Sequence, residues 1–167
     1  PLMKRTISVL VENRAGVLSR VAGLFARRGF NIESLAVGPT AEAGVSCITI
    51  VADDRDNVME QINKQLNKLI DVIKLKEYAP DELISRELLL IKVNAAAQNR
   101  GEIAELARLA GGKVCDITRS SMTIEYCDTP DRVENFLELC RTYGIKRVVR
   151  TGAAAIEKGQ HPLSLDE

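Results

Sequence analysis

Hydrophobic and polar positions follow two different periods along this chain. Ile7, Val9 and Val11 alternate with their neighbours, which predicts a strand. Apolar residues at i, i+3, i+4 and i+7 from Leu18 to Phe25 predict an amphipathic helix. The same reading of the first half predicts strands at 30–37, 45–52 and 72–78 and a second helix at 58–69.

The second half repeats this order after a break at Ala79-Pro80-Asp81-Glu82. It predicts strands at 88–93, 114–117, 122–126 and 145–151 and helices at 103–110 and 133–140. The last helix has a clear start, because Thr129 can cap it, Pro130 suits its first position and Asp131 favours the positive end of its dipole.

Two copies of β-α-β-β-α-β predict an α+β protein of two ferredoxin-like sandwiches, each with two helices on one face of an antiparallel sheet. We expect the domains to span 1–78 and 85–152, with a linker at 79–84 and a tail at 153–167. A domain of roughly 75 residues has a marginal core. We therefore expect a homodimer, joined at least through the first domain.

Charge and composition narrow the function. The 23 basic and 23 acidic residues leave no net charge, which argues against nucleic-acid binding. The central strands, VSCITIVA and MTIEYC, offer only Tyr126 for base stacking. No apolar run approaches the roughly 18 residues of a membrane span, and the start PLMKRTISVLVEN has no signal-peptide pattern.

The reactive side chains do not form a catalytic pattern. Cysteines 47, 115, 127 and 140 form no C-x-x-C pair, so we expect reduced core thiols in a cytoplasmic protein. The single histidine, His161, is expected to be solvated in the tail, and without a second one the sequence has no histidine triad or metal site. The acidic pairs Asp53-Asp54 and Asp166-Glu167 are interpreted as solvated caps.

The junction Asn13-Arg14-Ala15-Gly16 has two possible interpretations. The first helix begins near Gly16, so the N–H groups of residues 15–18 lack partners and can bind a small carboxylate, helped by the helix dipole. Alternatively, Asn13 only fixes the turn and Gly16 only relieves a backbone angle.

A family resemblance bears on this choice. The pattern N-x-x-G-x-L-x-x-V at residues 13–21 resembles the ACT amino-acid-sensing domain. The longer run SVLVENRAGVLSRVAGLFARRGFNIESLAVGPT, with QLNKLIDVIKL downstream, resembles the small regulatory subunit of acetohydroxyacid synthase, also called acetolactate synthase. SRELLLIKV and GGKVCDITRSS fit the C-terminal domain of that family.

The resemblance implies a valine site at a dimer interface. Its expected residues are Asn13, Ala15, Gly16, Val17, Leu18, Asn31 and Val37, with Asn31 contributed by the neighbouring subunit. The amides at 15–18 would take the carboxylate, and Leu18 and Val37 would meet the isopropyl group. Gly38 stands where relatives often have another small residue, which leaves selectivity against leucine and isoleucine open.

The resemblance also implies a regulatory subunit without chemistry of its own. Thiamine diphosphate, FAD and Mg²⁺ are expected on a separate catalytic large subunit, which this chain would activate and, with valine, inhibit. Two alternatives remain at this point: a stand-alone ACT-type amino-acid sensor acting on another partner, and a small enzyme of ferredoxin-like fold. The second alternative would need a reactive residue, and the best thiol, Cys47, falls within a predicted strand.

Overall fold

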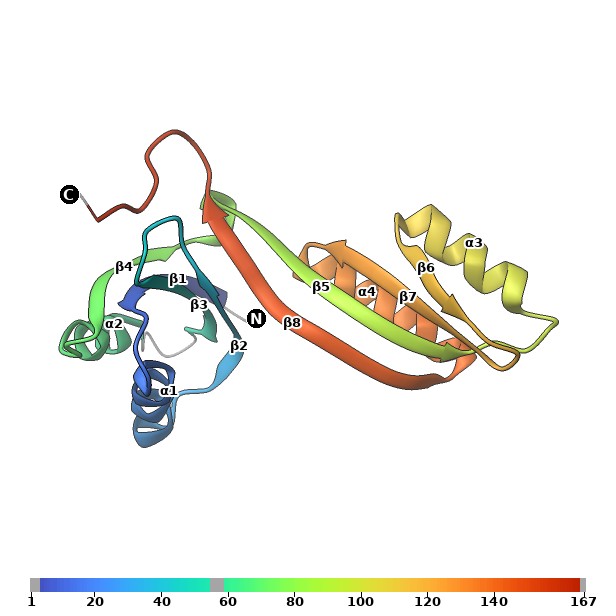
Figure 1. The fold of residues 1–167 in the computed structure, drawn as a ribbon, viewed down its shortest axis with the longest axis horizontal. Helices are drawn as coiled ribbons and strands as arrows, with labels where there is room; N and C mark the ends of the chain where they lie inside the picture. The colour runs from blue at the N-terminus through green and yellow to red at the C-terminus, as the bar shows by residue number, and fades with distance from the viewer. Residues whose placement is uncertain (1–3, 55–58, 166–167) are drawn as a thin grey trace. The chain divides into compact units, whose positions relative to one another are not determined.

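The computed structural model describes residues 4–54 and 59–165. The chain divides into two compact units, one of residues 1–84 together with 153–167 and the other of residues 85–152 (Figure 1). Val58 and the pair Asp166-Glu167 lie outside the described residues. Among the described residues, no helix has the length and apolar character needed to cross a bilayer.

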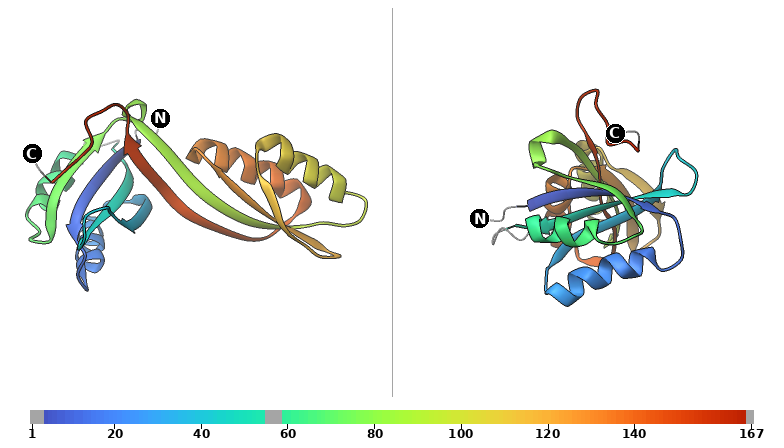
Figure 2. Two further views of the ribbon diagram at one scale, coloured as in Figure 1. Left: turned by 45° about the horizontal axis from the view of Figure 1, so that its top comes forward. Right: turned by 90° about the vertical axis from the view of Figure 1, so that its left-hand side faces the viewer.

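The first unit contains a four-stranded antiparallel sheet in the order β2-β3-β1-β4, with two helices on one face (Figures 1 and 2). Its elements in chain order are β1 (Lys4–Glu12), α1 (Val17–Arg28), β2 (Ile32–Pro39), β3 (Val45–Asp53), α2 (Met59–Asn67) and β4 (Val72–Tyr78). This arrangement confirms the predicted ferredoxin-like order.

The buried side of α1 differs by one residue from the predicted side. Val17, Val21 and Leu24 lie in the core, whereas Leu18 and Ala22 are exposed. Helical spacing permits both choices, since each set recurs every three or four residues. The observed choice buries Leu24 instead of Ala22, which removes more apolar surface from water. It also leaves Leu18 accessible at the start of the helix.

The second unit repeats the architecture with a sheet in the order β6-β7-β5-β8. Its elements are β5 (Leu83–Asn94), α3 (Arg100–Ala110), β6 (Lys113–Ile117), β7 (Ser121–Asp128), α4 (Pro130–Cys140) and β8 (Ile145–Glu157), with the short 3-10 helix η2 (Arg141–Tyr143) before β8. Another short 3-10 helix, η1 (Pro80–Glu82), lies in the first unit just before β5. As predicted, Thr129 caps α4, because its side-chain oxygen accepts the N–H of Arg132 at 3.4 Å.

Tyr126, the one aromatic side chain of the central strands that could have stacked on a base, lies in the core of the second unit. Tyr126 is 5% exposed and stacks on Phe136 with ring centroids 4.6 Å apart. Because this ring is enclosed on the helix side of the sheet, it offers no face to a nucleic-acid base.

The C-terminal end of the chain packs differently from a tail. β8 continues to Glu157, six residues beyond the predicted end at Thr151, and residues 153–167 belong to the first unit. The N–H of Ala153 donates to Ser34 Oγ at 2.8 Å, and the buried Tyr78 hydroxyl donates to Glu157 at 3.2 Å. Alanine favours strands weakly, so packing rather than local propensity accounts for this extension.

Candidate functional site

The junction between β1 and α1 is held by backbone bonds from both sides. The N–H of Asn13 donates to the carbonyl of Gly44 at 2.9 Å, and the N–H of Glu12 donates to the carbonyl of Asp71 at 2.9 Å. Gly16 then takes a left-handed conformation with φ +84° immediately before the helix. Only glycine adopts this conformation without a steric penalty, so Gly16 fixes the direction in which α1 leaves the strand.

This tip of α1 carries backbone donors without acceptors. Within the described part of the chain, four N–H groups here have no hydrogen-bond acceptor: those of Ala15, Gly16, Leu18 and Ser19. The N–H of Val17 donates to the carbonyl of Arg14 at 3.4 Å, and no acidic residue occupies the first turn. A small anion can therefore accept several hydrogen bonds here, with the helix dipole adding favourable potential.

The Asn13 side chain does not serve the turn. Asn13 is exposed, and its amide makes no hydrogen bond with any described residue. A turn-fixing asparagine would bond to backbone groups a residue or two further on. The interpretation of the junction as a plain turn thus accounts for Gly16, through its backbone angle, but leaves the Asn13 amide unexplained.

Arg20 was missed in the sequence and lies at the same tip. Its Nε donates to Asp71 Oδ2 at 2.6 Å, and the Asp71 side chain is only 3% exposed. The guanidinium of Arg20 holds the pKa of Asp71 below its usual value. The position four residues after Gly16 was the available signal, since such residues share a helix face. Asp71 lies 51 residues further along the chain, and no local pattern links it to Arg20.

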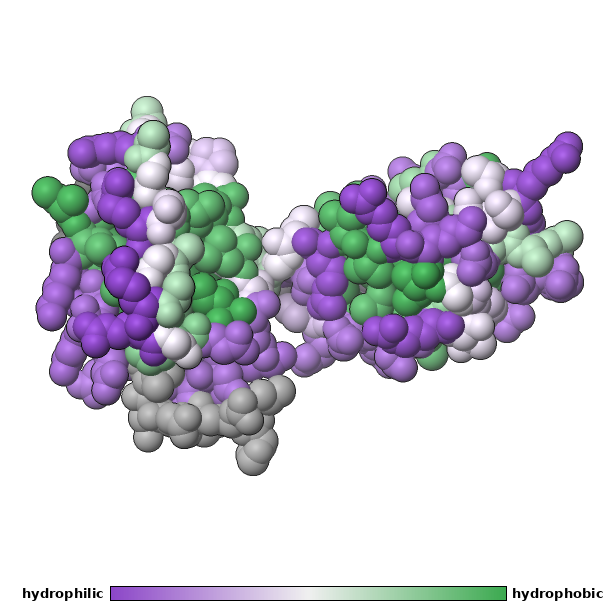
Figure 3. All heavy atoms as spheres, turned by 90° about the horizontal axis from the view of Figure 1, so that it is seen from below, coloured by the Kyte–Doolittle hydropathy of each residue, from purple (hydrophilic) through white to green (hydrophobic). Residues whose placement is uncertain are grey.

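Apolar side chains also reach the surface of the first unit, and hydrophobic areas are visible on the left of Figure 3. Leu18 is 44% exposed and Val37 is 47% exposed. Val37 pairs with the buried Ile48, which places it on the helix-facing side of β2. Val17 differs from both, because its side chain lies in the core and its N–H already donates to Arg14, so it does not offer the free donor that was predicted.

Asn31 does not join this group within one chain. It is exposed just beyond the C-terminal end of α1, and its amide makes no hydrogen bond with a described residue. α1 has 12 residues, and a helix of that length spans about 18 Å. The two asparagines therefore lie at opposite ends of the same helix, Asn13 at its start and Asn31 at its end.

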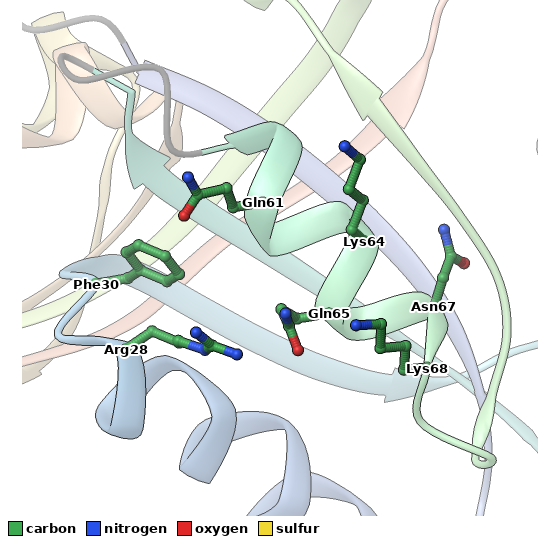
Figure 4. Close-up of a pocket in the computed structure, with 7 residues that line it drawn as sticks. All are labelled: Arg28, Phe30, Gln61, Lys64, Gln65, Asn67 and Lys68. Atoms are coloured by element: carbon green, nitrogen blue, oxygen red, sulfur yellow. The ribbon is translucent and has the colours of Figure 1, made fainter.

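A groove of about 490 Å³ opens between the C-terminal end of α1 and α2 (Figure 4). It is lined by Arg28, Phe30, Gln61, Lys64, Gln65, Asn67 and Lys68. Helix C-termini carry partial negative charge, which the cationic side chains of Arg28, Lys64 and Lys68 complement. Lys64 also pairs with Glu60 at 3.2 Å. The groove includes none of the residues predicted to bind the effector.

The cysteines correct one expectation. Cys140 is buried in the core, but Cys115 and Cys127 are exposed, so the prediction of core thiols was wrong for these two. All four thiols are free. Cys47 lies within β3, and burial raises the pKa of its thiol, which disfavours the thiolate that a nucleophile needs.

The histidine and the acidic pair that were considered as reactive groups have no catalytic arrangement among the described residues. His161 is exposed, as expected. Asp54 is buried, not solvated, and its carboxylate accepts the N–H of Met59 at the start of α2 at 3.0 Å. Its interpretation as a cap is confirmed, while its solvation was predicted wrongly. Among the described residues, no group of three or more His, Cys, Asp or Glu side chains is arranged to hold a metal.

Comparisons with known proteins cover both units. Residues 7–74 match the family described as AHAS small subunit-like ACT domain, and residues 86–159 match the family described as small subunit of acetolactate synthase. A probable acetolactate synthase small subunit from Archaeoglobus fulgidus is 51% identical over 157 residues, covering 94% of this chain and 98% of the relative.

Two further comparisons agree. The acetolactate synthase small subunit of Mycolicibacterium smegmatis is 49% identical over 154 residues, covering 92% of this chain and 91% of the relative. The crystal structure of the small subunit from Thermotoga maritima has 36% identity and a TM-score of 0.87, covering 95% of this chain and 99% of that one. Identity of this extent across both units shows that the chain belongs to the acetolactate synthase small-subunit family, with an ACT domain as its first unit.

Proposed function

We propose that this chain binds the catalytic large subunit of acetolactate synthase, raises its activity, and lowers that activity when valine accumulates. The large subunit would carry thiamine diphosphate, FAD and Mg²⁺ and perform the condensation of 2-oxo acids. This chain would contribute regulation and no reacting group. We also propose that the chain acts in the cytoplasm, in the pathway that makes branched-chain amino acids.

The observation that carries the proposal is the open tip of α1. A free amino acid presents a carboxylate, an ammonium group and a side chain. The unpaired N–H groups of residues 15, 16, 18 and 19 suit the carboxylate, and the unbonded amide of Asn13 suits the ammonium group. The exposed Leu18 and Val37 suit a short branched side chain.

A second copy of the chain would complete the site. In the first sheet β2 is an edge strand, since it pairs with β3 alone among the described strands. Antiparallel pairing of β2 with its copy would set the start of one strand beside the end of the other. Asn31, just before β2, would then approach Val37 and the α1 tip of the partner. This is why we propose a homodimer with valine between its chains.

The apolar part of such a site discriminates weakly among related ligands. One added methylene in an apolar pocket changes binding by about 1–3 kcal/mol. Gly38, next to Val37, places no side chain at that position, so leucine and isoleucine are also expected to bind, with affinities within this range of the valine affinity.

Valine would regulate by binding one arrangement of the two first units better than another. A ligand shifts such an equilibrium only by its difference in affinity for the two states. Typical coupling free energies are about 1–3 kcal/mol, which corresponds to roughly 5- to 150-fold. Partial inhibition at saturating valine is therefore compatible with the proposal.

The direct test is titration calorimetry of the purified chain with valine, leucine and isoleucine, followed by activity assays with the large subunit. We expect heat from valine binding, stimulation of the large subunit by the chain, and loss of that stimulation with valine. Absence of stimulation would refute the regulatory role. Stimulation without any response to valine would refute the effector assignment alone.

A complementation experiment tests whether two chains share each site. Asn13→Ala and Asn31→Ala each remove one side of the proposed site, so each variant alone is expected to lose valine binding. When the variants are mixed and allowed to exchange subunits, each mixed dimer has one site without either substitution. We expect about a quarter of the wild-type binding capacity to return. If no valine-binding capacity returns, the proposal that each site combines Asn13 of one chain with Asn31 of the other is refuted.

A further inference from the structure

We propose that Arg20 is a carboxylate-binding, specificity-determining residue of the effector site, and that Asp71 positions it. The inference rests on the proposed function, because it assigns a role toward the amino-acid effector. It adds a charged side chain to a site that otherwise offers neutral donors. It also predicts that this side chain recognises the carboxylate of the effector.

The first observation is where the guanidinium ends. A Cβ built on Gly16 would lie 2.9 Å from Arg20 Nη1, so the terminal nitrogen sits directly beside the glycine at the helix tip. Side chains on a helix lean toward its N-terminus, which is how a residue four positions later reaches this place. Any carboxylate that accepts the N–H groups of Ala15 and Gly16 would therefore meet this cation.

The second observation is the unused hydrogen-bonding capacity of Arg20. Its Nε is bonded to Asp71, and Nη1 and Nη2 have no acceptor among the described residues. A guanidinium presents its donors as a rigid planar fork that matches the two oxygens of a carboxylate. The side chain remains 47% exposed, so this fork is accessible to a ligand from solvent.

Asp71 fixes the orientation of this fork. Its carboxylate is nearly buried and holds Arg20 Nε at 2.6 Å, while its carbonyl accepts the N–H of Glu12. The residue is thereby attached both to the guanidinium and to the end of β1. An arginine held at one nitrogen loses less freedom on binding a ligand than an unrestrained one, so part of the ordering cost is met before the effector arrives.

The arrangement selects for a free carboxylate. Backbone N–H groups donate to an amide carbonyl as well as to a carboxylate oxygen, though less strongly, so on their own they discriminate only partly between valine and its amide. A guanidinium fork discriminates strongly, since charge-assisted bidentate bonds form only with the anion. Arg20 would restrict the site to free amino acids and exclude amides, amines and internal peptide residues.

The test compares valine and valinamide by titration calorimetry on the full chain. Arg20→Gln removes the charge and the fork, Arg20→Lys keeps the charge without the fork, and Asp71→Asn removes the positioning carboxylate. Arg27→Gln is the matched control, because it removes one arginine from the opposite end of the same helix. Circular dichroism checks that each variant is folded.

We expect Arg20→Gln to weaken valine binding about 10- to 100-fold and to leave valinamide binding nearly unchanged. Arg20→Lys and Asp71→Asn should give intermediate losses for valine, and Arg27→Gln none. Equal weakening of both ligands in Arg20→Gln would mean a purely structural role and would overturn the proposal, as would unchanged valine binding. If the unmodified chain binds no valine, the effector assignment itself fails, and the role of Arg20 fails with it.

Discussion

Replacing Gly16 with aspartate should place a permanent carboxylate where the effector carboxylate is proposed to bind. The backbone of Gly16 has φ +84°, and an L residue in this region costs about 1–2 kcal/mol, with aspartate at the lower end. The new carboxylate gains about 0.3–1 kcal/mol from the helix N-terminus. Among the described residues, the added Cβ closely approaches the flexible end of Arg20. The free energy of unfolding should therefore fall by about 1 kcal/mol or less.

Valine binding should suffer far more than stability. Two carboxylates about 4 Å apart at an effective dielectric constant near 20 repel each other by roughly 4 kcal/mol. The substituted side chain also occupies N–H groups that the ligand would need. A loss of about 3 kcal/mol or more corresponds to at least a 100-fold weaker affinity, measurable by calorimetry on the full chain.

Gly16→Ala separates charge from backbone strain in this experiment. Alanine adopts the same unfavourable φ without adding a carboxylate, so it should destabilise the chain by about 1 kcal/mol. It should reduce valine affinity less than aspartate does, and only through displacement of Arg20 Nη1, which lies 2.9 Å from the added Cβ. Urea unfolding followed by circular dichroism gives the stability difference for both variants. Equal valine affinity in the aspartate and alanine variants would refute an anion site at this helix tip.

Two further predictions concern contacts away from the proposed effector site. In the second unit Arg150 donates to the buried Glu87 at 2.6 Å and to Glu134 at 2.7 Å. Arg150→Gln should therefore lower the free energy of unfolding, measured by urea unfolding, by about 3 kcal/mol, because it leaves a buried carboxylate unpaired. Adding Glu87→Gln should recover much of this loss. In the first unit, burial and the neighbouring Glu157 raise the pKa of Tyr78 to about 12. Because its pKa is raised in the folded state, unfolding should become easier as pH rises from 10 to about 12. Burial also raises the pKa of Tyr126 and Tyr143, so Tyr78→Phe should reduce that loss and remove one late-ionising tyrosine from a spectrophotometric titration.

The order of strands and helices could be predicted from the sequence because it depends on local periodicity. Alternation at Ile7, Val9 and Val11 requires a strand, and Gly16 and Gly29 mark helix ends where a left-handed residue is needed. Repetition of the pattern after residue 80 was enough to predict two ferredoxin-like units. These signals are local, because each depends on neighbours within a few positions of the chain.

The candidate site was only partly predictable for the same reason. The free N–H groups follow from the position of a helix start, which the sequence marks with Gly16. The partner of Arg20 could not be predicted, because Asp71 reaches it only after the turn following α2 has folded against β1. Leu18 was placed wrongly on the buried face of α1, since helical spacing alone does not decide between Leu18 and Val17 as the core residue.

By itself, the sequence determined the elements, their doubled order, the glycine at the helix tip and the runs that mark the family. Only the tertiary structure decided which face of α1 is buried, which carboxylate orients Arg20, and that residues 153–157 extend β8, with Ala153 bonded to Ser34, 119 residues earlier in the chain. Backbone conformation responds to adjacent residues, whereas burial and ion pairing depend on surfaces that meet only when distant segments pack together.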